Sequence, residues 1–227
     1  MRKVVIALPG NNFSGTFLKQ WSQSLMLLQN KGYTIMLTNE YSSFVTFSRM
    51  KCLGLDVLRG VEQKPFNNGQ LDYDVFVTID SDIFWLPEQL IELIEGCATQ
   101  YPVYSGVYRM TDLKSYACVE KWDEEYFKEH GSFQFMTTKD FDEKKDQGPF
   151  KVAYNGMGFM AIRKGVLENL RYPFFDQPLQ EMTLKDGTII RDLCSEDVAL
   201  CKNLKAAGYP VWVDLKLMVG HEKKLVI

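Results

Sequence analysis

The stretch that decides the fold is Asp72-Tyr-Asp-Val-Phe-Val-Thr-Ile-Asp-Ser-Asp-Ile-Phe-Trp85. Its centre, Val75 to Ile79, is an apolar run rich in β-branched residues. This composition predicts a strand that is covered on both faces, as central strands of parallel sheets are. Two carboxylates, Asp80 and Asp82, follow the strand directly. Because open α/β sheets bind ligands at the carboxyl ends of their strands, the acidic pair predicts a ligand site at this edge.

Strand and helix patterns alternate along the rest of the chain. Strands are predicted at residues 4–8, 34–38, 103–107, 150–162 and 210–213, and helices at 15–29, 44–54, 87–96, 164–170 and between the caps Ser195 and Gly208. This order predicts an α/β protein, a single Rossmann-like domain whose mostly parallel central sheet is flanked by helices.

Two segments outside that alternation also have readable patterns. Asp186-Gly187 predicts a hairpin turn between residues 182–184 and 188–190. Residues 139–147 carry seven charged side chains without periodicity, which predicts a mobile loop.

Composition excludes several classes of protein. The chain of 227 residues is 46% hydrophobic, which is enough for one large core, and its net charge of −3 gives no sign of a nucleic-acid surface. No apolar run approaches the roughly 20 residues of a membrane span. The five cysteines are odd in number and lack paired spacing, which favours reduced thiols in a cytosolic protein.

The triplet Asp80-Ser81-Asp82 is the first candidate for chemistry. If the strand continued, alternation would send both carboxylates to the same side, where they would repel each other without a cation between them. Hard oxygen ligands suit Mg²⁺ or Mn²⁺, and such an ion would also hold the phosphates of a nucleotide. The structural alternative is a solvated loop in which one aspartate caps the next helix.

The second candidate is His221, which follows Val219-Gly220 after an apolar run. A neutral imidazole is a good Mn²⁺ ligand and would complete a site begun by Asp82. The alternative is a hydrogen-bonded histidine of the core or the C-terminal segment. The other histidine, His130, lies in a polar, irregular stretch and is expected to be solvated.

Two further motifs have a functional and a structural interpretation. In Ser195-Glu196-Asp197, one carboxylate would take a proton from an acceptor hydroxyl, or both would simply complement the dipole of the helix that they begin. In Asn155-Gly156-Met157-Gly158, the glycines would let the backbone approach a sugar or diphosphate closely, or they would form a bulge or tight turn.

Taken together, the acidic triplet, the glycine segment 154–163, the acidic helix start and Gly220-His221 resemble the GT-A class of nucleotide-sugar glycosyltransferases. The resemblance covers nearly the whole chain. It implies a nucleotide-binding half at residues 1–110 and an acceptor-binding, catalytic half at 111–227. GT-A chains usually continue beyond this histidine, so the chain is either a minimal enzyme or one domain of a longer polypeptide.

The resemblance also implies roles for individual residues. Asp80, Asp82 and His221 would be metal ligands, with Asp80 also serving the ribose, and Asp197 would be the catalytic base, with Glu196 second. The donor would contact a larger set of residues, which are Pro9, Asn39, Glu40, Arg49, Asp80, Ser81, Asp82, Gly156 and Gly158.

The implied reaction is transfer of a sugar, with inversion, from a nucleotide diphosphate sugar to a hydroxyl of a glycan, protein or small molecule. A Mn²⁺ or Mg²⁺ ion would be required, UDP is the favoured nucleotide, and the location would be cytoplasmic. Three alternatives remain, namely a retaining GT-A enzyme, a sugar-phosphate nucleotidyltransferase and a nucleotide-binding module without activity. A nucleotidyltransferase should carry a basic residue after its first strand, and Pro9-Gly10-Asn11-Asn12 has none.

Overall fold

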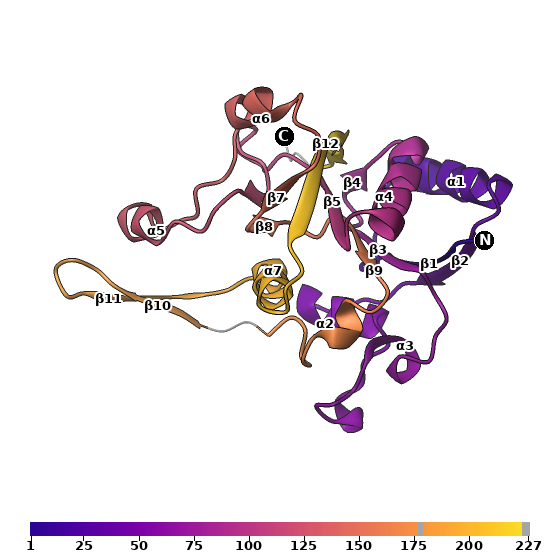
Figure 1. Ribbon diagram of the computed structural model, residues 1–227, viewed down its shortest axis with the longest axis horizontal. Helices are drawn as coiled ribbons and strands as arrows, with labels where there is room; N and C mark the ends of the chain where they lie inside the picture. The colour runs from indigo at the N-terminus through magenta and orange to yellow at the C-terminus, as the bar shows by residue number, and fades with distance from the viewer. Residues whose placement is uncertain (177–178, 224–227) are drawn as a thin grey trace.

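The computed structural model describes residues 1–176 and 179–223. A seven-stranded sheet forms the centre of the protein (Figure 1). In spatial order its strands are β2 (Thr34–Thr38), β1 (Lys3–Ala7), β3 (Val75–Ile79), β9 (Phe159–Arg163), β5 (Val103–Val107), β12 (Val211–Met218) and β7 (Phe150–Val152). β9 and β7 run antiparallel to their neighbours, whereas the other strands point the same way. The mostly parallel α/β sheet predicted from the sequence is confirmed.

Three two-stranded sheets accompany the central one. They pair β4 (Ile83–Phe84) with β13 (Gly220–His221), β6 (Cys118–Val119) with β8 (Tyr154–Asn155), and β10 (Leu179–Thr183) with β11 (Ile189–Leu193). The last pair is the hairpin that Asp186-Gly187 predicts, and it extends away from the body of the protein (Figure 1).

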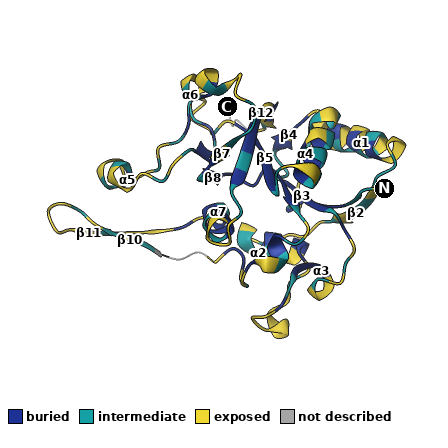
Figure 2. Cartoon of the chain, in the orientation of Figure 1, coloured by how far each residue is buried: buried dark blue, intermediate teal, exposed yellow. Residues whose placement is uncertain are grey.

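Helices cover both faces of the sheet. They are α1 (Gly15–Asn30), α2 (Val45–Cys52), α3 (Pro65–Asn68), α4 (Pro87–Thr99), α5 (Glu124–His130), α6 (Thr138–Lys144) and α7 (Glu196–Ala206), with 3-10 turns η1 (Val57–Arg59) and η2 (Leu167–Asn169). Buried residues of α1 and α4 share one core cluster, and those of α2 and α7 share the other. The strands between them are the most deeply buried part of the protein (Figure 2).

β3 shows why the sheet can be covered twice. All five of its residues are buried, and successive side chains enter opposite clusters: Val75, Val77 and Ile79 face α1 and α4, whereas Phe76 faces the α2 and α7 side. This is the two-residue alternation of an extended chain with apolar side chains in both directions. The strand therefore fixes the position of Asp80, the residue that follows it.

Helix α4 runs beyond Gly96, where the sequence predicts its end. A Cβ atom at Gly96 would lie 2.5 Å from the ring of Tyr104, so the glycine is needed for close packing rather than for a left-handed cap. On α1, Phe17, Gln20, Ser24 and Leu28 are buried, whereas Leu18 is exposed.

The helix predicted at 164–170 is wrong. Gly165 has φ +92, a left-handed conformation that interrupts a right-handed helix, and only the turn η2 forms after it. Glu168 accepts hydrogen bonds from the Gly165 amide at 2.7 Å and from the Tyr73 hydroxyl at 2.7 Å. These hydrogen bonds fix the segment as a tight turn against Tyr73, which lies just before β3.

The mobile loop predicted at 139–147 is also wrong, because most of it forms α6. Phe141 is buried with its ring 4.4 Å from that of Tyr116, and Asp140 accepts hydrogen bonds from the Thr137 amide and hydroxyl, both at 2.7 Å. One aromatic contact and one cap hold a helix whose outer face is charged. Charge density alone is thus a poor guide to disorder here.

Replacing Asp140 by Ala is expected to destabilise α6 by about 1 kcal/mol. Its hydrogen bonds to Thr137 lower the pKa of Asp140, so the stabilisation is present above the carboxylate's ordinary pKa and is lost as the pH falls through the lowered value. Hydrogen exchange of the α6 amides measures this. Asp142→Ala, an exposed carboxylate of the same helix, is the control and should leave exchange unchanged.

Candidate functional site

The site lies where β1 and β3 end. Leu8, Pro9 and Gly10 continue β1, and Asp80, Ser81 and Asp82 continue β3. The two segments touch, because a Cβ atom added to Gly10 would lie 3.2 Å from the Ser81 side chain. Gly10 itself has φ +139, a conformation that other residues rarely adopt. The carboxyl ends of neighbouring parallel strands thus form one continuous polar edge.

Asn39 and Glu40 hold this edge together from β2. The Asn39 amide donates hydrogen bonds to the carbonyls of Leu8 at 2.6 Å and Gly10 at 2.8 Å, and the Gly10 amide donates to the Glu40 carbonyl at 3.0 Å. The side chain of Asn39 therefore positions the loop after β1. Its predicted contact with a donor nucleotide, and that of Glu40 and Pro9, stay predictions.

Arg49 is the central charged residue of the buried side of the site. Its guanidinium donates two hydrogen bonds to Asp80, at 2.9 and 3.0 Å, and one to Glu196, at 3.2 Å, and its side chain is only 5% exposed. Burial alone would lower the pKa of Arg49, but the charge and hydrogen bonds of Asp80, together with the charges of Glu196 and Asp197, raise it. The arginine therefore stays charged and joins α2, the end of β3 and the start of α7.

Glu196 is buried beside this arginine. Burial raises the pKa of Glu196, and the nearby charge of Arg49 opposes that shift. Because Arg49 occupies one carboxylate oxygen, Glu196 serves as the arginine's partner. The predicted role of Glu196 as the second choice of base stays a prediction.

Asp197 lies on the more open side of the same helix start. It accepts a hydrogen bond from the hydroxyl of the buried Tyr154 at 2.9 Å, and a second from the Ser195 hydroxyl. Burial, and then the charge of Asp197, raise the pKa of Tyr154, so its hydroxyl remains a donor. Tyr154 thus fixes the orientation of the carboxylate.

Asp82 and His221 meet across the short β4–β13 pair. His221 Nε2 lies 3.1 Å from Asp82 Oδ2, although 139 residues separate them in sequence. His221 Nδ1 lies 2.8 Å from the carbonyl oxygen of Arg109, so this nitrogen carries a proton and donates. In the neutral ring Nε2 then presents a lone pair to the carboxylate oxygen. Two acceptors this close favour a proton or a metal cation at that point.

The geometry of this pair fits a divalent cation. Adjacent ligands of an octahedral Mg²⁺, each about 2.0–2.1 Å from the ion, lie about 3 Å apart. A backbone acceptor on the other ring nitrogen is the usual outer partner of a metal-bound histidine. Among residues 1–176 and 179–223, no cluster of three or more His, Cys, Asp or Glu side chains is arranged around one point. The structure therefore brings together two of the three predicted ligands, and Asp80 as a ligand stays a prediction.

Lys223 contacts the same oxygen of Asp82 that faces His221. Its ammonium group lies 2.6 Å from Asp82 Oδ2. Burial would raise the pKa of Asp82, but its contacts with His221 and Lys223 lower it to about 2. The carboxylate is therefore ionised at neutral pH, and a cation bound at Oδ2 would displace the Lys223 ammonium.

Gly156 and Gly158 pack against Tyr108, a buried residue that the sequence analysis missed. A Cβ atom on Gly156 would lie 2.1 Å from the Tyr108 hydroxyl, and one on Gly158 would lie 2.9 Å from the ring. The opposite edge of this ring contacts His221 at a centroid distance of 5.0 Å. The glycines thus place the tyrosine that supports the histidine, and their predicted approach to a donor stays a prediction.

Gly156→Ala is expected to destabilise the protein by about 1–3 kcal/mol, because the added methyl group overpacks the Tyr108 hydroxyl. Urea unfolding measures the loss. Gly15→Ala is the control, since nothing lies within 4 Å of a Cβ atom there. Adding Tyr108→Phe to Gly156→Ala removes the contacted oxygen and should recover part of the loss.

Tyr108 and Tyr154 have no local sequence signal that marks them as site residues. Each follows or forms a strand end, where tyrosine is common in any sheet protein. No sequence signal marks the carbonyl of Arg109, which contacts His221, as part of the site either. Only the placement of β5, β8 and α7 side by side reveals them.

Comparison with known proteins supports the fold. No family model matches the sequence, and no curated protein matches it as a relative. Among solved structures, a protein designated A197 from STIV aligns over 100% of this chain and 97% of its own, with 16% identity and a TM-score of 0.50. The chain shares the fold of A197.

Two further structures are similar at a lower level. One is 4-diphosphocytidyl-2C-methyl-D-erythritol synthase from Anaerococcus prevotii, at 12% identity and TM-score 0.45, covering 97% of this chain and 90% of that one. The other is inositol-1-phosphate CTP transferase from T. maritima, at 12% identity and TM-score 0.37, covering 97% and 85%. Likeness at this level carries no assignment of chemistry.

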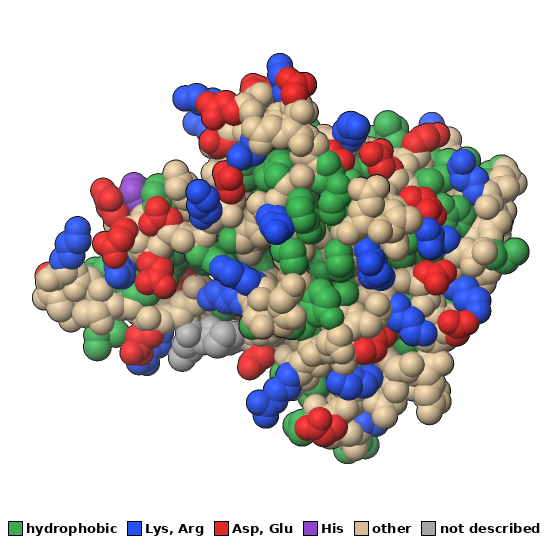
Figure 3. All heavy atoms as spheres, in the orientation of Figure 1, with side chains coloured by type: hydrophobic (Ala, Val, Ile, Leu, Met, Phe, Trp, Pro, Cys, Tyr) green, Lys and Arg blue, Asp and Glu red, His purple; other side chains and the backbone are tan. Residues whose placement is uncertain are grey.

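Within the described ranges, no helix is long and apolar enough to cross a bilayer. On the face shown in Figure 3, basic and acidic side chains are interspersed. The five cysteines are all buried and unpaired, as the sequence predicts.

Proposed function

We propose that the protein is a metal-dependent, inverting glycosyltransferase of the GT-A type. It would move a sugar from a nucleotide diphosphate sugar, preferably a UDP-sugar, to an acceptor hydroxyl. The buried, unpaired cysteines suit a reducing compartment, so we propose a cytoplasmic location.

The single observation that carries this proposal is the pair of Asp82 and His221. Their facing atoms lie 3.1 Å apart after a buried strand, at the sheet edge where open α/β proteins bind ligands. A Mn²⁺ or Mg²⁺ ion held there would neutralise the charge of the leaving nucleotide diphosphate. Asp80, held by Arg49, would keep its outer edge toward the ribose.

Asp197 is the residue best suited to the acceptor. Unlike Glu196, it is not paired with Arg49, and Tyr154 fixes its orientation. The acceptor oxygen would give its proton to Asp197 and form a bond to the anomeric carbon, while the bond from that carbon to the diphosphate oxygen breaks. Attack from the opposite face inverts the configuration.

The test is hydrolysis of donors by purified protein. With Mn²⁺ present and no acceptor, water replaces the acceptor, and one of a panel of UDP-, GDP- and dTDP-sugars should be cleaved slowly to the nucleotide diphosphate. EDTA should abolish the cleavage, and excess Mn²⁺ should restore it. Absence of both cleavage and ligand-induced thermal stabilisation across the panel would refute the proposal.

Asp197→Asn distinguishes the inverting from the retaining mechanism. An inverting enzyme should lose acceptor transfer by about a hundredfold or more without its base, whereas a retaining one needs no dedicated base and stays active. The same panel of nucleotide sugars also tests the alternative that the protein is a nucleotide-binding module without activity. Such a module would bind a nucleotide yet cleave none of the sugars.

A sugar-phosphate nucleotidyltransferase is the second candidate, because one of the similar structures is named a CTP transferase of inositol-1-phosphate. The loop Pro9-Gly10-Asn11-Asn12 lacks the basic residue that such an enzyme needs near the triphosphate. The reactions release different products. Pyrophosphate from CTP or UTP plus a sugar phosphate, with no cleavage of nucleotide sugars, would establish this candidate instead.

A further inference from the structure

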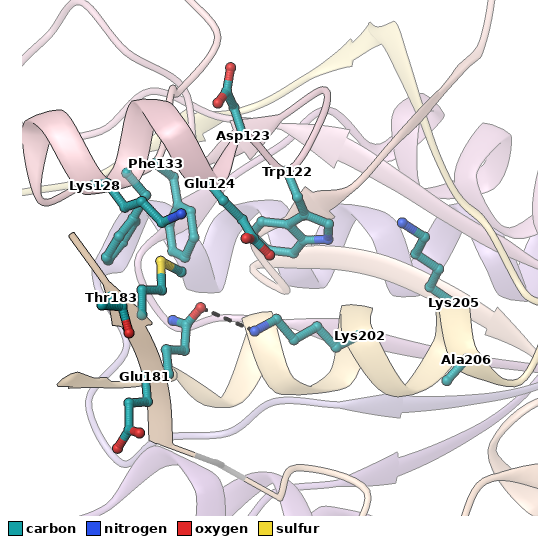
Figure 4. A pocket seen from close by; sticks show the side chains of 13 residues that line it. Trp122, Asp123, Glu124, Lys128, Phe133, Glu181, Thr183, Lys202, Lys205 and Ala206 are labelled. Carbon is teal, nitrogen blue, oxygen red and sulfur yellow. Dashed lines mark hydrogen bonds between the residues drawn. The ribbon is translucent and has the colours of Figure 1, made fainter. Parts of the chain in front are cut away.

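A cavity of the described chain lies against the C-terminal half of α7, away from the acidic triplet. It measures about 840 Å³ and is enclosed by α5, α7 and β10 (Figure 4). Its aromatic side is formed by Trp122, Phe127 and Phe133. No element of the β1–β3 edge lines it. It is therefore a separate compartment that neither the metal pair nor the donor edge explains.

Aromatic contacts connect this cavity to Asp197. The ring of Trp122 lies 5.0 Å from that of Phe133 and 6.5 Å from that of Tyr154, the residue whose hydroxyl binds Asp197. Lys202 closes the floor, with its ammonium group 5.5 Å from the Trp122 ring and 3.1 Å from Gln180 (Figure 4). Asp197 and Tyr154 do not line the cavity, but a ligand against Trp122 would lie one aromatic residue away from the proposed base.

The third wall of the cavity is the open edge of a strand. Gln180, Glu181, Met182 and Thr183 all line the cavity, whereas no residue of β11 does. Successive side chains of a strand point to opposite faces, so four consecutive lining residues mean that the cavity lies along the backbone edge. Of the described residues, only β11 pairs with β10, and that partner lies on the other side.

The register shows which backbone groups face the cavity. The Leu184 amide donates to the Thr188 carbonyl at 2.8 Å, and bonded and non-bonded pairs alternate along an antiparallel ladder. Gln180 and Met182 therefore bond to β11. The N–H and C=O groups of Glu181 and Thr183 point outward, along the cavity.

We propose that this cavity binds an extended polypeptide, which adds to β10 as a third strand and presents a Ser or Thr hydroxyl to Asp197. Outward N–H and C=O groups at every second residue match the backbone of an extended peptide, which a sugar chain cannot reproduce. Lysines and carboxylates both border the cavity, so peptides of either charge find partners. The inference rests on the proposed function, because it names the class of acceptor.

The test pairs two proline variants on the two edges of one hairpin. Thr183→Pro removes the N–H that faces the cavity, and Ile189→Pro removes the N–H directly opposite, on the outer edge of β11. Thr183 and Ile189 lie opposite each other without a hydrogen bond between their backbones, so neither proline removes a hydrogen bond between β10 and β11. The probe is a synthetic library of short peptides that contain Ser or Thr, compared with a set of oligosaccharides.

Two readouts keep the inference separate from the proposed function. Transfer of labelled sugar to the peptides is measured relative to donor hydrolysis by the same variant, and binding of fluorescent peptides is measured without donor. We expect peptide transfer and peptide binding by the wild type, a loss of about tenfold in both for Thr183→Pro, and no change for Ile189→Pro.

Equal behaviour of the two proline variants would overturn the inference, as would transfer to oligosaccharides with none to peptides. If no donor is hydrolysed, the proposed function fails, and peptide binding alone then decides whether β10 accepts a third strand. Binding that Thr183→Pro weakens and Ile189→Pro does not would support the strand site in either case.

Discussion

Replacing Asp82 by Asn is expected to reduce Mn²⁺-dependent hydrolysis of the donor sugar by about a hundredfold or more. The amide keeps the size of the side chain but removes the charge that would hold the cation beside His221 Nε2, 3.1 Å away. The rate at saturating Mn²⁺, and the Mn²⁺ concentration that gives half of it, should both change. Circular dichroism should show an intact fold.

The matched control is Asp72→Asn, at the opposite end of β3. Asp72 is an exposed carboxylate that pairs with Lys3 before β3 begins, so its replacement removes the same charge without touching the site. Hydrolysis should be unchanged. If Asp82→Asn kept full activity with an unaltered Mn²⁺ requirement, the proposed cation site would be wrong.

Replacing Arg49 by Leu is expected to lower the free energy of unfolding by about 3–5 kcal/mol. The change leaves the carboxylates of Asp80 and Glu196 without the cation that pairs with both, and Glu196 is buried. Urea unfolding measures the loss. Arg49→Lys should recover part of it, because a lysine keeps the charge but not the two parallel hydrogen bonds to Asp80.

Arg2 provides the control for this prediction. It makes the same two-pronged contact with Glu95, at 3.0 and 3.0 Å, but its side chain is 33% exposed. Arg2→Leu should therefore cost under about 1 kcal/mol. A similar cost for both variants would mean that the buried network around Arg49 contributes no more than a surface ion pair.

The parts of the fold that the sequence predicted are those with local causes. β3 follows from an apolar, β-branched run of five residues, and the β10–β11 hairpin from Asp186-Gly187. The errors also have local causes that were read incorrectly. α6 has a charged surface but is held by Phe141 and Asp140, and Gly96 belongs to a packing contact rather than to a helix end.

The site was less accessible to prediction, because its contacts join distant parts of the chain. Local motifs and the family resemblance point to Asp80, Asp82 and Asp197. The contacts that distinguish these carboxylates from others, however, join residues far apart in the sequence. Arg49 meets Glu196 across 147 residues, and Tyr154 meets Asp197 only because β8 lies beside α7. Trp122 and the edge of β10 gave no sequence signal at all, since their arrangement depends on tertiary structure.

The position of β9 has a consequence for synthesis of the protein on the ribosome. This strand lies between β3 and β5, although it follows both in the chain, so residues 1–110 cannot form a continuous sheet as they emerge. The gap closes only after residue 163 has been added, and Asp82 gains its partner only with His221. A nascent chain would therefore be unable to form the proposed cation site until almost all of these residues had been translated.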